Sequence, residues 1–161
     1  MKIYHQRQEQ LLPINLQECW TFFSDPGNLE AITPPRMKFT IQNISGQGIY
    51  PGQLIRYRIA IFPFYQVNWL TEITAVKEQE YFIDDQRIGP YALWHHYHHF
   101  QEVENGVLMT DEVTYALPFG WLGQWAHALL IGRELNTIFE YRRRVLAARF
   151  SKENKNLTFQ V

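Results

Sequence analysis

Residues 94–117 decide the fold, and they read WHHYHHFQEVENGVLMTDEVTYAL. The dipeptide Asn105-Gly106 favours a tight β-hairpin turn, because both residue types accept a positive φ. A two-residue turn here pairs Glu104 with Val107. Side chains alternate between the two faces of a strand, so one face of this hairpin is apolar and is expected to line the interior. That face carries Trp94, Phe100, Met109, Val113, Tyr115 and Leu117.

The same alternation carries three polar side chains into the apolar face: His96, His98 and Asp111. In the predicted register Asp111 is a diagonal neighbour of His98, a separation that long side chains bridge. Three interpretations are open. The residues could form a buried network that fixes the strand register, they could contact a ligand, or His98 and Asp111 could act as a catalytic acid–base pair.

Metal binding is a further interpretation of the same residues. Two histidines at positions i and i+2 of a strand are a known ligand geometry, and Asp111 is a candidate third ligand. The run from His95 to His99 nevertheless gives each face only two histidines, and no fourth ligand is evident nearby. We therefore expect no native metal and no cofactor.

Length and composition limit the classes of protein to consider. The chain has 161 residues and a formal net charge of −1, and it is 46% hydrophobic, 16% aromatic and only 19% charged. This length fits one domain, expected over residues 1–150 with a polar tail at 151–161. Balanced charge argues against a nucleic-acid partner, and no apolar run approaches the roughly 20 residues of a membrane span. No secretion signal is evident, and the single Cys19 cannot form an internal disulfide, so we expect a cytoplasmic location.

Hydrophobic periodicity predicts the remaining elements. The expected strands cover 2–12, a segment beginning near 39, 55–61, 66–76 and 81–86. Two short helices follow the first strand, one after Asn15 and one over 26–32, where Asp25-Pro26 is a good helix start. The last element is a long helix over 121–150 with an apolar stripe. The three arginines at 142–144, near its C-terminal end, are expected to form a solvated face.

Several motifs, taken in this order of elements, carry a family resemblance. They are residues 25–30 (DPGNLE), residues 33–35 (TPP), Gln86 with Gly89-Pro90, the alternating Trp94, His96, His98 and Phe100, then Asp111, Val113 and Tyr115, and the turn at 117–120 (LPFG). The chain resembles the START-like (SRPBCC) superfamily, also called the helix-grip or birch-pollen-allergen fold, over residues 2–150. Within that superfamily it looks like a bacterial cyclase/dehydrase-like, ligand-binding subgroup.

The resemblance implies an α+β helix-grip fold, in which a curved antiparallel sheet of about seven strands wraps around a long C-terminal helix. It also implies a cavity between the two. The expected apolar wall consists of Tyr57, Trp69, Trp94, Phe100, Val113 and Tyr115. The expected orienting polar groups are Gln86, His96, His98 and Asp111. For Gln86, an equal alternative is that its amide stabilises the neighbouring turn.

Three functional hypotheses follow. The preferred one is non-enzymatic binding of a small, mostly apolar molecule, lipid-, polyketide- or aromatic-like, in the internal cavity. The alternative is a cyclase or dehydratase in which His98 and Asp111 move protons. The third is a protein-interaction module, which predicts an exposed apolar patch around Trp121, Trp125 and the Pro63-Phe64 turn.

Overall fold

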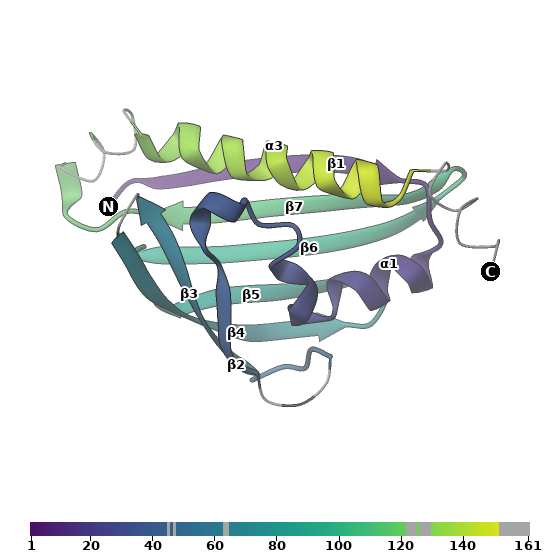
Figure 1. Cartoon of the computed structure of the whole chain (residues 1–161), viewed down its shortest axis with the longest axis horizontal. Helices are drawn as coiled ribbons and strands as arrows, with labels where there is room; N and C mark the ends of the chain where they lie inside the picture. The colour runs from purple at the N-terminus through teal and green to yellow at the C-terminus, as the bar shows by residue number, and fades with distance from the viewer. Residues whose placement is uncertain (45, 47, 63–64, 122–124, 126–129, 152–161) are drawn as a thin grey trace.

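The computed structural model describes residues 1–44, 46, 48–62, 65–121, 125 and 130–151. Its strands are β1 (Ile3–Leu12), β2 (Thr40–Ile44), β3 (Leu54–Phe62), β4 (Tyr65–Lys77), β5 (Tyr81–Ile88), β6 (Leu93–Val103) and β7 (Gly106–Ala116). They form one antiparallel sheet in the order β1-β7-β6-β5-β4-β3-β2. Figure 1 shows that the sheet is strongly curved, with β2 and β3 turned across the direction of β6 and β7. The predicted sheet of about seven strands is confirmed.

The helices lie on one face of this sheet (Figure 1). They are α1 (Leu16–Phe23), the short 3₁₀ helices η1 (Pro26–Leu29) and η2 (Pro35–Met37), and α3 (Gly132–Arg149). The side chain of Asn15 caps α1 by accepting from the Glu18 amide at 2.8 Å. The predicted second helix begins at Pro26 but is a 3₁₀ turn that ends earlier than expected. After it the backbone continues in separate turns, in which the Ala31 amide donates to the Asn28 carbonyl and the Thr33 amide to the Glu30 carbonyl, each at 3.2 Å.

The long terminal helix is confirmed over Gly132–Arg149. Most of its expected first third, residues 122–124 and 126–129, lies outside the described part of the chain, as does the expected tail after Ser151. Figure 1 shows α3 running along the β1 and β7 side of the sheet, and α1 contacts β6 and β7. No helix in the described ranges combines the length and the apolar character needed to cross a membrane.

The turn of the β6–β7 hairpin differs from the prediction. The observed ladder pairs Val103 with Gly106, so the turn residues are Glu104 and Asn105 and the predicted register is wrong by two residues. Gly106 adopts φ +141°, and a Cβ placed there would overlap the carbonyl oxygen of Leu12. The glycine therefore serves a close approach to the end of β1. A shift of two residues leaves both faces unchanged, because the side-chain period of a strand is two.

The hydrophobic core lies between the sheet and the helices. Phe100, only 2% exposed, lies in ring contact with Trp20, Phe23 and Phe82. Cys19 is also fully buried on α1, and burial raises the pKa of its thiol to about 12. A thiol with so high a pKa carries almost no thiolate at neutral pH, so Cys19 is a core residue rather than a nucleophile.

Candidate functional site

Four ionisable side chains meet on the inner face of β5, β6 and β7. His98 stands directly opposite Asp111 in the β6–β7 ladder, and His96 stands directly opposite Asp84 in the β5–β6 ladder. Cross-strand neighbours on one face have Cβ atoms about 5 Å apart. The sheet register alone therefore assembles these residues, which we call the polar cluster. His96, His98 and Asp111 are buried, and Asp84 is mostly buried.

Within the polar cluster, each imidazole contacts both carboxylates. Nε2 of His98 donates to Oδ2 of Asp84 at 2.9 Å, and Nδ1 of His98 lies 2.7 Å from Oδ1 of Asp111. Nε2 of His96 donates to the same Asp111 oxygen at 3.2 Å, and its Nδ1 lies 3.5 Å from Oδ2 of Asp84. The two imidazole centroids are 3.7 Å apart. The four groups therefore close a ring of alternating imidazoles and carboxylates.

The two imidazoles differ in proton affinity. Burial opposes the charged form of both, but attraction to Asp111 and hydrogen bonds to both carboxylates outweigh it at His98 and raise its pKa. At His96, burial and repulsion from His98 prevail and lower the pKa. Burial alone would raise the pKa of each carboxyl group. The charge of His98 nevertheless holds the pKa of Asp111 well below its usual range, and a hydrogen bond from His98 lowers that of Asp84. Of the two imidazoles, His98 therefore holds a proton more strongly than His96, and both carboxyl groups favour the charged form.

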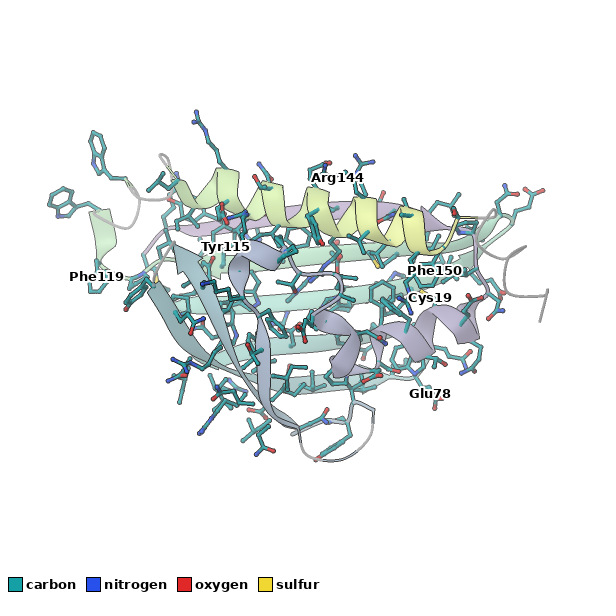
Figure 2. The ribbon with its side chains drawn as sticks, viewed as in Figure 1. Cys19, Glu78, Tyr115, Phe119, Arg144 and Phe150 are labelled. Atoms are coloured by element: carbon teal, nitrogen blue, oxygen red, sulfur yellow. The ribbon has the colours of Figure 1, made fainter. Side chains whose placement is uncertain are left out.

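Arg142 of α3 brings a further positive charge to the polar cluster. Its side chain is 11% exposed, its Nη1 lies 3.5 Å from Oδ2 of Asp111, and its guanidinium lies 5.4 Å from the centre of the Phe139 ring. The expectation of a solvated arginine face is therefore wrong for Arg142. It is right for Arg143 and Arg144, which are exposed. Figure 2 shows Arg144 on the side of α3 that faces away from the sheet.

Sequence reasoning did not select Asp84 and Arg142 as site residues, although each had a signal. Asp84 lies two residues after Phe82 along β5. Side chains two residues apart point to the same face of a strand, so Asp84 shares the inward face with Phe82. Arg142 follows Leu135 and Phe139 at helical spacing, which places it on the apolar stripe of α3. A charged residue on a buried stripe indicates a partner in the interior.

Two cavities border the polar cluster. Cavity 1, of about 80 Å³, has apolar walls from α1, η1 and strands β3 to β5 that include Phe23, Ile32, Ile55, Ile73 and Phe82. Cavity 2, of about 150 Å³, has apolar walls that include Phe39, Ile59, Trp69, Tyr91, Trp94 and Ile138. Neither is fully enclosed. Both are lined by Leu29, Tyr57, Asp84, His98 and Arg142. The polar cluster thus forms a charged boundary between two apolar spaces.

The structure brings some of the predicted site residues to these cavities and leaves others elsewhere. Cavity 2 is lined by Tyr57, Trp69, Trp94, His96 and His98. Asp111 lines neither cavity. It contacts the two imidazoles and Arg142, and these side chains line the cavities. Three predicted wall residues also lie outside both linings and pack in the interior: Phe100, Val113 and Tyr115. Tyr115 stacks on Tyr4, with ring centroids 5.5 Å apart.

Gln86 acts on the turn rather than lining either cavity. Its Nε2 donates to the carbonyl oxygen of Tyr91 at 2.8 Å, and its Oε1 accepts from the Tyr91 amide at 3.2 Å. A Cβ at Gly89 would overlap the Gln86 side chain, so the turn needs a glycine there. Tyr91 lines cavity 2. Gln86 therefore positions a wall residue through the backbone.

A metal ion has one candidate site among the described residues. Asp84, His96 and His98 each offer a ligand atom within 4.8 Å of the others. The predicted trio contained Asp111 where this one contains Asp84. Metal ligation requires an unprotonated nitrogen on each imidazole. The raised pKa of His98 and the nearby guanidinium of Arg142 both oppose the binding of a metal cation. These residues therefore favour a hydrogen-bonded network that holds a proton over a metal site.

The interaction-module hypothesis predicts exposed aromatic residues after β7. Trp121 is 68% exposed and Trp125 is 64% exposed, as that hypothesis requires. Phe119 is also exposed, and Figure 2 shows it beyond the end of the sheet. The Pro63-Phe64 turn lies outside the described residues.

No protein-family model matches the sequence, and no curated protein matches it. Solved structures do match. Protein CV1439 from Chromobacterium violaceum has a TM-score of 0.68 and 11% identity, covering 91% of this chain and 96% of its own. Ginseng major latex-like protein 151 from Panax ginseng has a TM-score of 0.66 and 12% identity, with 92% and 97% covered. A point mutant of norcoclaurine synthase from Thalictrum, in complex with a transition-state analogue, has a TM-score of 0.62 and 14% identity, with 93% and 96% covered.

These likenesses extend over nearly the whole length of each protein at low sequence identity. They are therefore evidence about the architecture alone, because function resides in the site and not in the fold. The TM-scores of 0.62 to 0.68 compare the whole architecture of this chain, which consists of the antiparallel sheet, the early short helices and the long terminal helix. The chain has the helix-grip fold that the sequence resemblance implied.

Proposed function

We propose that this protein binds a small, mostly apolar molecule between the sheet and α3. The observation that supports the proposal is the pair of apolar cavities that meet at the polar cluster. Binding pockets typically combine apolar walls with a few placed polar groups. Here the aromatic rings of Trp69 and Trp94 supply wall area, and His98 and Arg142 supply orientation.

Cavity volume limits the size of the ligand. An apolar cavity of about 150 Å³ holds a molecule the size of benzene. Cavity 2 has about this volume, and cavity 1 is smaller. A ligand with one or two rings, or a short branched chain, fits this space better than a long acyl chain. Of the lipid-, polyketide- and aromatic-like classes, the aromatic-like class is therefore favoured.

The proposal is tested by native mass spectrometry of the purified protein, followed by extraction and identification of the ligand that copurifies. A second measurement uses benzene as a probe, with binding followed by ligand-observed NMR. The variant Ile138→Trp fills cavity 2, so we expect it to lose the probe. Thr137→Trp adds the same side chain on the exposed side of α3 and should retain it. Equal binding by both variants, or none by the wild type, would refute the proposal.

Acid catalysis is the second candidate function, and the state of His98 favours it. His98 borders both cavities and has a raised pKa. Both of its nitrogens face carboxylates, so one of these two contacts must open before His98 can give its proton to a bound molecule. A cyclase or dehydratase would use this proton on the bound molecule.

The two candidates are separated by mass analysis of the copurified molecule after incubation with fresh protein. Pure binding returns the molecule unchanged, whereas catalysis converts it. If conversion occurs, His98→Ala should abolish it while binding persists. A His98→Ala protein that binds normally and converts at an unchanged rate would eliminate the catalytic role.

The remaining finer assignments stay predictions. Cytoplasmic location is supported by a lone, buried Cys19 that has no disulfide partner. Membership of the bacterial cyclase/dehydrase-like subgroup is supported by the motif resemblance alone.

A further inference from the structure

Two buried N–H groups in the lining of cavity 2 make no hydrogen bond to any described residue. They are Nε of Arg142 and Nε1 of Trp69. Arg142 is on α3 and Trp69 is on β4, so the two donors come from different walls of the same cavity. A buried donor without an acceptor is costly, and such groups in folded proteins ordinarily have a partner.

Several acceptors that line cavity 2 already have a partner. Both imidazoles contact Asp84, and the carboxylate of Glu134 lies 2.6 Å from Arg36. The Tyr57 hydroxyl pairs with the Thr71 hydroxyl at 3.0 Å. Arg142 makes a single ionic contact to Asp111, at 3.5 Å, although a guanidinium has five N–H donors. Two other buried atoms of this lining, Oε1 of Glu134 and Nδ1 of His98, also lack a hydrogen bond to a described residue, but each is in an ion pair. The two buried atoms of this lining that have neither kind of partner are both donors.

We infer that the ligand presents a hydrogen-bond acceptor, a carbonyl or carboxylate oxygen, to the guanidinium of Arg142. The inference rests on the proposed function and names the ligand class: a small aromatic ketone or aromatic acid. Carboxylates and carbonyls match the planar donor geometry of arginine, and a hydrogen bond to a charged donor is stronger than one between neutral groups. The indole N–H of Trp69 is the second donor available to the same polar end.

Three probes of nearly equal size separate shape from polarity. α-Methylstyrene fits the aromatic space without an acceptor, acetophenone replaces its methylene group with a carbonyl oxygen, and benzoate offers a carboxylate. We expect acetophenone and benzoate to bind the full-length protein at least about tenfold more tightly than α-methylstyrene, by isothermal titration calorimetry. Acetophenone should also shift the indole N–H signal of Trp69, which is identified by its loss in Trp69→Phe.

The variant Arg142→Met removes the donors while keeping an unbranched stem of similar length. We expect it to bind the three probes with equal affinity, within about threefold. Arg142→Lys keeps the charge but loses the planar fork, and should lose most of the preference. The control is Arg144→Met on the exposed side of the same helix, which should keep the wild-type preference.

The outcomes distinguish the two proposals. Equal affinity of the wild type for all three probes overturns the acceptor inference and leaves ligand binding intact, as does a preference that survives in Arg142→Met. Absence of binding by every probe overturns both.

Discussion

Nδ1 of His98 lies 2.7 Å from a carboxylate oxygen of Asp111, and the two residues occupy directly opposite positions of the β6–β7 ladder. The contact is thus built into the strand pairing. Its two members are 6% and 2% exposed, so the charges face each other with little water. Coulombic attraction at this separation is much stronger in the interior than at the surface.

The variant Asp111→Asn should destabilise the protein strongly. It leaves the charge of His98 and that of Arg142 without their shared carboxylate, and breaking a buried ion pair costs about 3 to 5 kcal/mol. The matched control is Glu112→Gln, one residue along, whose exposed carboxylate pairs with Arg7. We expect that variant to change the free energy of unfolding by less than about 1 kcal/mol. Urea denaturation measures both, and equal costs would contradict the buried-pair account.

The two buried histidines should titrate on opposite sides of the ordinary imidazole value of 6.5. His98 has the higher pKa because it faces Asp111 and bonds to both carboxylates. His96 has the lower one because it is buried beside the charge of His98. Carbon- and nitrogen-detected NMR of the imidazole rings gives the pKa of each histidine. The reverse order would contradict the charge assignment.

Stability should depend on pH in a way that His96→Gln reveals. A raised pKa at His98 stabilises the fold fully below about pH 6.5, and this contribution is lost as pH rises through the folded-state value. The lowered pKa of His96 acts oppositely, since its contribution is present above about pH 6.5 and lost as pH falls through the folded-state value. The two effects act on opposite sides of about pH 6.5, so together they make the wild type most stable near that pH.

The variant His96→Gln removes the contribution of the His96 pKa to stability, and its side-chain amide keeps a donor for Asp111. The free energy of unfolding of His96→Gln should then decrease as pH rises above about 6.5. Urea titrations between about pH 6 and pH 9 measure the slope. A flat or rising profile in this variant would show that His98 does not carry the raised pKa.

Gly89→Ala should disturb the two hydrogen bonds between the Gln86 side chain and the backbone of Tyr91, and little else. The added Cβ would overlap the Gln86 side chain, which is held by two hydrogen bonds to Tyr91. We expect a loss of about 1 to 2 kcal/mol in the wild type, and under about 0.5 kcal/mol when Gln86 is already alanine. A double-mutant cycle in urea measures this coupling. Independent, additive costs would place the strain elsewhere.

Truncating Phe100 should affect stability without affecting the preference among ligands. Its ring packs against Trp20, Phe23 and Phe82 and lies outside both cavity linings. Phe100→Leu should lower the free energy of unfolding by about 1 to 3 kcal/mol, in the range of large-to-small core changes. The ranking of acetophenone over α-methylstyrene should persist in this variant. A changed ranking would mean that Phe100 contributes to the binding wall.

The faces of the β6–β7 hairpin were predictable from sequence because strand alternation depends on local geometry alone. The inward placement of His96, His98 and Asp111 followed from it and is observed. The register was not predictable in the same way. Gly106 lies against the carbonyl of Leu12, nearly a hundred residues earlier in the chain, and a pattern within the hairpin does not contain that contact.

The positions of Asp84 and Arg142 likewise depend on contacts between segments that are distant in the sequence. Asp84 belongs to β5, whose pairing with His96 depends on the alignment of two separate strands. Arg142 stands beside two other arginines, and only the rotation of α3 against the sheet separates the buried one from the exposed pair. Strand alternation and helical spacing limit which residues can face the interior, while tertiary packing determines which of them do.

The charged boundary between the two cavities has a consequence for how this scaffold could diversify. His96, His98 and Asp111 are fixed by strand pairing, whereas Ile138 on α3 and Ile32 after η1 shape the apolar ends. Substitutions on those helical and turn segments would resize either chamber without disturbing the ionic ring that stabilises the sheet. Selection could therefore retune the molecule's preference for ligands while its folding stability stayed nearly constant.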